Sequence, residues 1–128
     1  MARLTAVGTV TLLLVTLAGA VGCVLRYLME YLVRRRSPSS RPWATVTANV
    51  LGSGIAGFVA YCFVNFSGVH LRSVLLTGFC GGLTTFSSAF AVPAVMHREH
   101  HWRYSLTLVL TTPLLCTGAF VLGTALAH

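Results

Sequence analysis

Hydrophobic side chains along this chain fall into four long runs, and short polar segments separate them. A helix needs about 20 consecutive apolar residues to cross the roughly 30 Å hydrocarbon core of a bilayer, and all four runs reach that length. We therefore predict an all-α membrane protein with four transmembrane helices, over residues 6–27, 43–64, 74–96 and 104–127. The runs leave no room for a separate soluble domain, so residues 1–128 are expected to form one integral membrane domain.

Three polar segments connect the predicted spans. The first, Arg34–Pro42, carries four arginines and two prolines and is expected to be a surface loop, as are residues 65–73 and 97–103. At the N-terminus, Arg3 and an apolar run that ends in small residues also resemble a secretory signal. Three further apolar runs follow it, which argues against a cleaved, exported protein.

The third run is interrupted by small and hydroxyl-bearing residues, because Gly81 and Gly82 are followed by Thr84 and Thr85. Glycine weakens a helix and β-branched threonine restricts χ1, so we expect the backbone to unwind between Gly81 and Thr85. Unwound backbone at membrane depth must be buried in protein or line a watery cavity, where its carbonyls and hydroxyls are available to an ion. The alternative is a small-residue face on which helices pack closely.

Composition agrees with a membrane protein and excludes a soluble one. Hydrophobic residues make up 55% of the chain and charged residues only 9%, and the mean hydropathy is +0.80. All nine basic residues are arginines, and Glu30 and Glu99 are the only acids, so the formal net charge is +7. Most of these arginines flank the apolar runs, which is typical of membrane proteins and does not indicate nucleic-acid binding.

Cysteine and histidine form no metal-site pattern. Each apolar run contains one cysteine, without a CxxC pair or a histidine at ligand spacing, so we expect four reduced packing residues. These cysteines are Cys23, Cys62, Cys80 and Cys116. His97, His100 and His101 cluster near the end of the third run, and we interpret them as a solvated interfacial group in preference to a zinc site.

Two polar side chains stand out within the predicted spans. The amide of Asn49, in the second span, must form hydrogen bonds in an apolar environment, and Thr45 lies four residues earlier on the same helical face. Gly52, Ser53 and Gly57 offer a close-packing surface beside it. Asn49 therefore either bonds to a neighbouring helix or lines a pore. Arg26, just inside the end of the first span, is either an interfacial anchor or a functional cation.

Three motifs in these runs resemble the Fluc/CrcB family of fluoride channels, and the resemblance extends over essentially the whole chain. The family's third span carries a GGxTTFSTF motif, which residues 81–88 match. The leucine-arginine-tyrosine triplet of its first span is matched by residues 25–27, and the asparagine and glycine of its second span by Asn49 and Gly52. The resemblance implies a fluoride-selective channel, not an enzyme, that lowers cytoplasmic fluoride by passive export through a bacterial plasma membrane.

The resemblance also implies an assembly. Two subunits would pack antiparallel in the lipid bilayer, with two fluoride pores along the dimer and a structural sodium ion, which is not transported, at its centre. The backbone carbonyls of Gly81 and Thr84 from each subunit would hold the sodium. Carbonyl oxygens exposed by an interrupted helix suit a hard cation, so the physical chemistry agrees with this assignment.

The pore residues that the resemblance implies are Thr45, Asn49, Phe86, Ser87, Ser88 and Thr112. Fluoride is strongly hydrated, so hydrogen-bond donors must replace its water, and the ring edge of Phe86 is electropositive. A pore without a fixed cation binds the anion weakly enough to release it. The role of Arg26 stays open.

One position departs from the family pattern. Where the family has a second phenylalanine, three residues after the first, this chain has Ala89, and Phe90 is displaced by one position. One residue corresponds to a turn of about 100° on a helix. Either Phe90 is brought back by a local irregularity, or the pore that this residue would line is degenerate.

Other classes of protein fit the sequence less well. A small multidrug-type, proton-coupled exporter also has four spans, but it needs a membrane-embedded carboxylate, and neither Glu30 nor Glu99 lies in the middle of a span. A non-conducting structural subunit would not explain the placement of Asn49 and the hydroxyl groups. An enzyme has no support, since the sequence shows no nucleophile with a base, no paired carboxylates and no cofactor motif.

The arginines are unevenly distributed between the two sides of the predicted bundle. Arg3 and Arg72 lie on the side of the termini, and six arginines lie on the side of the first and third loops: Arg34, Arg35, Arg36, Arg41, Arg98 and Arg103. By the positive-inside rule, both termini are external. A subunit that inserts both ways should be nearly balanced, so we hypothesise a fixed orientation and an antiparallel paralogue as partner. A homodimer is the alternative, if this imbalance still permits mixed insertion.

Overall fold

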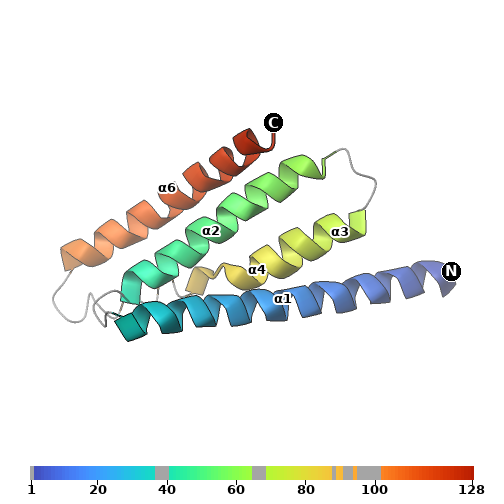
Figure 1. The fold of residues 1–128 in the computed structure, drawn as a ribbon, viewed down its shortest axis with the longest axis horizontal. Coiled ribbons are helices and arrows are strands. Elements are labelled where there is room, and N and C mark those ends of the chain that lie inside the picture. The colour runs from blue at the N-terminus through green and yellow to red at the C-terminus, as the bar shows by residue number, and fades with distance from the viewer. Residues whose placement is uncertain (1, 37–40, 65–68, 88, 91–93, 95–101) are drawn as a thin grey trace.

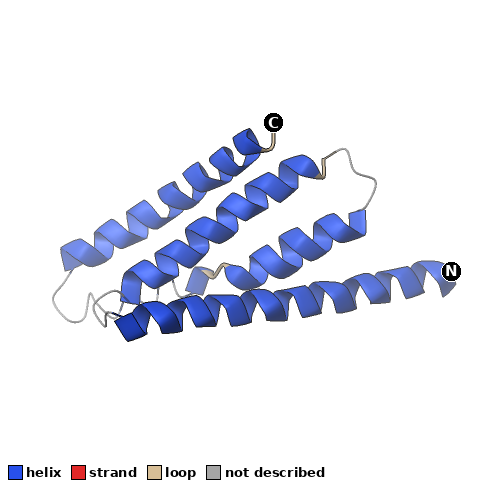
Figure 2. Cartoon of the chain, viewed as in Figure 1, coloured by secondary structure: helices blue, strands red, loops and turns tan. Residues whose placement is uncertain are grey.

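The protein is all-helical over the part of the chain that its computed structural model describes, which is residues 2–36, 41–64, 69–87, 89–90, 94 and 102–128. Figure 2 shows helices joined by short connections and no strand among these residues. Three of the helices are long and apolar enough to cross a membrane, and their apolar parts are Gly8–Val33, Trp43–Cys62 and Trp102–Leu126. The prediction of an all-α membrane protein is confirmed.

The helices lie side by side along a common direction (Figure 1). Their bounds are α1 (Ala2–Arg36), α2 (Arg41–Cys62), α3 (Val69–Ser73), the π-helix η2 (Val74–Cys80), α4 (Gly81–Leu83) and α6 (Trp102–Leu126). The α3, η2 and α4 segments follow one another as a single rod that runs in the same direction as α1, whereas α2 and α6 run in the opposite direction. Both chain termini therefore lie at the same end of the bundle.

Two expected loops are shorter than the sequence analysis indicated. Helix α1 continues through Arg36 and α2 begins at Arg41, so most of the predicted loop over residues 34–42 is helical. Arginine is a good helix former. Pro42 falls in the first turn of α2, where backbone N–H groups have no partner within the helix, so the N–H that proline lacks costs no hydrogen bond. Similarly, helix α3 begins at Val69, inside the predicted loop over residues 65–73. The histidine cluster of the third predicted loop lies outside the described residues.

Close backbone contacts hold the bundle together. Helix α2 packs mainly against α6, and α1 packs against η2 and α4. A methyl group added to Gly57 of α2 would collide with the carbonyl of Phe120 on α6, and one added to Gly82 of α4 would collide with the carbonyl of Gly19 on α1. Only glycine permits these approaches, so the predicted close-packing surface on α2 is real, and a second one joins α4 to α1.

Most large apolar side chains of α1 and α6 point outward. Leu12 on α1 is 68% exposed and Leu114 on α6 is 71% exposed, whereas the buried core is formed largely by small or medium residues of α2. Outward-facing leucines suit a chain whose surroundings are lipid tails or another subunit. All four cysteines are free thiols, and only Cys80 is buried. Cys23 and Cys62 are exposed on the protomer, so the expectation that all four are packing residues does not hold for them.

Candidate functional site

The site begins where helix α4 ends. After Leu83 the chain leaves the helical conformation, and Thr84 is extended, with φ −90° and ψ 155°. Thr85 is also non-helical, and Phe86 and Ser87 are helical again. The Thr84 N–H and the Thr84 hydroxyl both donate to the Cys80 carbonyl, each at 2.9 Å, which closes the helix end. Unwinding was expected over residues 81–85, but residues 81–83 still belong to α4.

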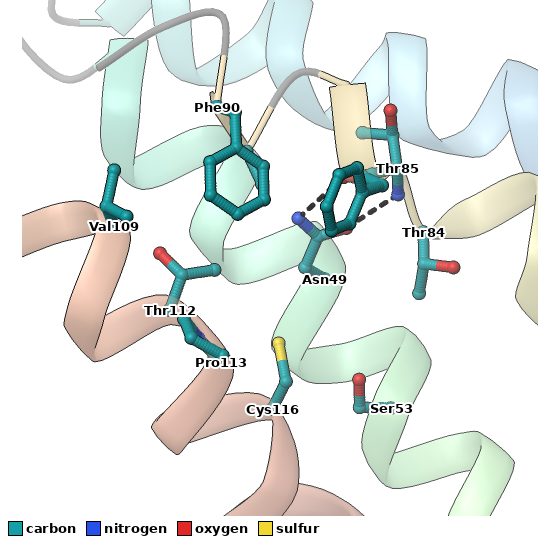
Figure 3. Close-up of a pocket in the computed structure, with 11 residues that line it drawn as sticks. Asn49, Ser53, Thr84, Thr85, Phe90, Val109, Thr112, Pro113 and Cys116 are labelled. Carbon is teal, nitrogen blue, oxygen red and sulfur yellow. Dashed lines mark hydrogen bonds between the residues drawn. The ribbon is translucent and has the colours of Figure 1, made fainter. Parts of the chain in front are cut away.

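Asn49 of α2 is bonded to the backbone of this non-helical stretch. Its Nδ2 donates to the Thr85 carbonyl at 3.2 Å, and its Oδ1 accepts the Thr85 N–H at 2.7 Å, as the dashed lines in Figure 3 show. The side chain is only 5% exposed. From the sequence, a bond to a neighbouring helix and a place on a pore were both open for Asn49, with Thr45 as a nearby group. The amide in fact reaches across to the chain that follows α4, and Thr45 is buried elsewhere on α2.

Gly52 makes room for the extended residue. A Cβ atom at Gly52 would lie 2.5 Å from the Cγ2 atom of Thr84 and 3.6 Å from side-chain carbons of Leu83. Real Cβ atoms do not approach a carbon atom as closely as 2.5 Å. The asparagine and the glycine of the second-span motif thus act on the same target, because Asn49 bonds to Thr85 and Gly52 accommodates Thr84.

A cavity of about 300 Å³ opens beside this pair of threonines, between α2, α6 and the residues after α4 (Figure 3). Eleven residues line it, and none of them carries a charge: Asn49, Ser53, Thr84, Thr85, Phe86, Ala89, Phe90, Val109, Thr112, Pro113 and Cys116. The rings of Phe86 and Phe90 stand 4.5 Å apart between centroids, at an angle of 44°. The cavity therefore combines amide and hydroxyl groups with aromatic edges in an uncharged environment.

Five of the ten predicted site residues meet at this cavity, namely Asn49, Thr84, Phe86, Phe90 and Thr112. Four others do not line it: Gly81 and Ser87 are exposed, Thr45 is buried, and Arg26 is half-buried on α1. The Ser87 hydroxyl is 3.1 Å from that of Thr85, so it still belongs to the same polar neighbourhood. Ser88 lies outside the described residues.

Phe90, the residue displaced by one position from the family pattern, lies beside Phe86. Its ring contacts that of Phe86, and both rings line the same cavity. Residues four apart on a helix lie on one face, one above the other, so Phe90 can reach Phe86 as readily as a residue at position 89. The structure thus brings Phe90 to the cavity beside Phe86, and the role of its ring in a pore stays a prediction.

Sequence reasoning missed several of the lining residues. Val109, Pro113 and Cys116 share the face of Thr112 at helical spacing, and Ser53 lies one turn after Asn49, so periodicity alone would have found them. Thr85 was noted for its effect on the helix and not as a partner of Asn49. Its contribution to that pair is its backbone, which no side-chain pattern reveals.

Comparisons with known proteins identify the family of this chain. The sequence profile of the family described as "CrcB-like protein, Camphor Resistance (CrcB)" matches residues 13–124. The fluoride-specific ion channel FluC of Sulfurovum sp. (strain NBC37-1) is 38% identical over 112 residues, which cover 88% of this chain and 89% of that protein. That of Shewanella denitrificans is 37% identical over 113 residues, covering 88% and 91%.

A third relative, the fluoride-specific ion channel FluC of Rhizobium meliloti (strain 1021), is 42% identical over 91 residues, covering 70% of this chain and 72% of that protein. These relatives are named as ion channels and not as enzymes, in agreement with the absence of a catalytic pattern in the sequence. The match covers most of the chain and overlaps each of the three long apolar helices found among the described residues. The chain is therefore a multi-pass membrane protein of the CrcB-like family.

Proposed function

We propose that this chain is a subunit of a fluoride-selective channel that lets cytoplasmic fluoride leave the cell down its electrochemical gradient. The observation that carries the proposal is the uncharged cavity at which a buried asparagine amide meets two phenylalanine rings. The names of the relatives support the same ion. A bacterial plasma membrane is the setting that those relatives suggest.

The groups at the cavity suit a small, strongly hydrated anion. An amide nitrogen has two hydrogens, and only one of those on Asn49 is needed for the Thr85 carbonyl, so the second can replace a water molecule of fluoride. Phenylalanine rings present an electropositive edge, and Phe86 is 81% exposed on the protomer. With no fixed cation among the lining residues, the anion is held weakly enough to move on.

Thr112 needs a local change before it can contribute a donor. Its hydroxyl donates to the Leu108 carbonyl at 2.7 Å, so in this conformation it offers only lone pairs and a methyl group to the cavity. Rotation of that hydroxyl proton away from Leu108 would provide a second donor opposite Asn49. We therefore propose Thr112 as a pathway residue that responds to the ion. Thr45, Ser87 and Ser88 stay pathway residues on the resemblance alone.

The working unit that we propose is an antiparallel dimer of four-span subunits, whose third span is interrupted at Thr84 and Thr85. The helical residues before and after those two threonines support the interrupted span, and both termini lie at one end of the bundle, as an even number of crossings requires. The exposure of Phe86, Gly81 and the apolar surface of α1 on a single protomer supports a partner subunit.

A structural sodium ion at the centre of that dimer fits the residues present. Gly81 is exposed, and a methyl group added there would meet only the Leu76 carbonyl, at 3.9 Å, so its backbone can be approached from outside. The extended conformation of Thr84 turns its peptide group out of the helical pattern. The Gly81 and Thr84 carbonyls of both subunits would hold the ion through charge–dipole contacts, so that the ion joins the two subunits.

The arginine distribution further suggests external termini and a paralogous partner of opposite orientation. Reporter proteins fused to the C-terminus test this topology. An external signal alone agrees with a fixed orientation, whereas a substantial cytoplasmic signal beside it would favour an antiparallel homodimer.

The competing transporter class, a proton-coupled multidrug exporter, is disfavoured by the same cavity, because no carboxylate lines it. The deciding experiment is fluoride efflux from liposomes that contain the purified chain, alone and together with its closest genomic paralogue. We expect fluoride release and no chloride release. Robust release by the chain alone would favour a homodimer, and no fluoride release in either preparation would reject the channel.

A further inference from the structure

Asn49 occupies the places of two helical hydrogen-bond partners. In a continuous α-helix the N–H of residue 85 would be donated to the carbonyl of Gly81, and the carbonyl of residue 85 would accept from the N–H of Ala89. Here the Thr85 N–H goes to Asn49 Oδ1 at 2.7 Å, and the Thr85 carbonyl accepts from Asn49 Nδ2 at 3.2 Å. The side chain of Asn49, from a different helix, thus replaces both backbone groups to which Thr85 would bond in a continuous helix.

From this pair we infer that Asn49 is a positioning residue for the cation site: by taking the Thr85 N–H, it keeps that donor away from the Gly81 carbonyl, which is then available to sodium. The inference rests on the sodium site of the proposed function. It also assigns to Asn49 a role apart from any contact with fluoride, because the same amide holds the helix interruption and borders the cavity.

The surroundings of the pair favour this role. Asn49 is almost fully buried, so an amide without partners at this position would be strongly unfavourable, and Thr85 is the group within its reach. The Thr84 conformation and the space left by Gly52 place the Thr85 peptide in front of the amide. Without Asn49, the Thr85 N–H would donate to the Gly81 carbonyl, as in a continuous helix. That carbonyl would then no longer be available to bind the ion.

The test measures the stabilisation of the purified protein by sodium, as the midpoint of thermal unfolding in NaCl against N-methyl-D-glucamine chloride at constant ionic strength. Asn49→Leu removes both bonds at similar volume and should weaken the apparent sodium affinity at least tenfold. Asn49→Asp keeps the acceptor for the Thr85 N–H and should retain the sodium response, although it should lose fluoride efflux. Ser53→Ala, one turn along α2 on the same cavity, is the matched control and should respond to sodium like the wild type.

A rescue variant separates this role from a general packing effect. Thr85→Pro deletes the N–H that competes for the Gly81 carbonyl, and the extended Thr84 before it is the conformation that a residue preceding proline prefers. Added to Asn49→Leu, Thr85→Pro should restore most of the sodium response. A packing defect at position 49 would not be repaired in this way.

Several outcomes would overturn the inference: a wild-type sodium response in Asn49→Leu, an equal loss in Asn49→Asp, or a double variant no better than Asn49→Leu. If Asn49→Leu does not fold, Asn49→Asp and Thr85→Pro decide, because each leaves the Gly81 carbonyl without the competing donor. Loss of the sodium response in either variant would contradict the inference. A wild-type protein that does not respond to sodium would reject the sodium site itself. Fluoride efflux, measured separately, would still test the channel.

Discussion

Gly52 is the position at which one added methyl group should damage the site most. In Gly52→Ala the new Cβ atom would lie 2.5 Å from Thr84 Cγ2, so the two carbons must separate by about 1.0–1.5 Å to reach ordinary contact. Rotation of Thr84 would sacrifice its hydroxyl bond to Cys80, worth about 1 kcal/mol. Overpacking adds about 1–3 kcal/mol, and the better helix propensity of alanine returns about 1 kcal/mol. We expect a net destabilisation of about 1–3 kcal/mol.

Gly54→Ala is the matched control, because a Cβ atom there would meet the Ala119 carbonyl at an ordinary 3.6 Å. The assays are the thermal midpoint in detergent and the initial rate of fluoride efflux from liposomes. If the methyl group destabilises the conducting conformation by about 1.4 kcal/mol relative to a conformation in which Thr84 has moved away, the population of the conducting conformation falls roughly tenfold. Efflux by Gly52→Ala should therefore fall about tenfold. If Gly52→Ala matched Gly54→Ala in both assays, the argument that Gly52 accommodates Thr84 would be wrong.

Three further predictions follow from the same structure. Asn49→Asp should abolish fluoride efflux, because a carboxylate repels the anion; a folded variant with undiminished efflux would remove Asn49 from the pathway. Gly57→Ala should destabilise the protein by about 1–3 kcal/mol through its collision with the Phe120 carbonyl, whereas Gly118→Ala, with nothing within 4 Å, should not; equal thermal midpoints would contradict this packing. Replacing sodium by a large organic cation should weaken the proposed dimer in size-exclusion experiments, and a dimer equally stable without sodium would argue against the proposed site at Gly81 and Thr84.

The hydrophobic pattern came close to two of the three long apolar helices among the described residues, because it reports the property that lipid selects, but its third span, 74–96, matches none of them. The predicted spans 43–64 and 104–127 differ by only a few residues from the apolar helices Trp43–Cys62 and Trp102–Leu126. The true helix ends were harder to predict. Hydropathy marks where a segment becomes too polar for lipid, but arginine is compatible with a helix, so α1 continues through Arg36 into the polar region. Nothing in the local pattern predicted the π-helical turn at η2.

The candidate site was only partly accessible to sequence reasoning. Asn49 stood out because an amide in an apolar run needs partners, but its partner is a backbone group 36 residues away, and side-chain periodicity carries no information about such a pairing. The spacing of Phe90 left two alternatives open, a local irregularity or a degenerate pore. The contact of its ring with that of Phe86 became visible only in the fold. The chemistry of the site was visible in the sequence, whereas its connections depended on tertiary packing.

The length of α1 makes bilayer thickness a variable that acts on the site. Its apolar stretch, Gly8–Val33, has 26 residues, which at a rise of 1.5 Å give about 39 Å, some 9 Å more than a hydrocarbon core of about 30 Å. Such a helix tilts in thin membranes and stands more upright in thick ones. Gly82 rests against the backbone of Gly19 without space for a methyl group, so α4 must follow any change in that tilt. Lipids of different chain length should thus move the helix end at Thr84, and with it the conductance.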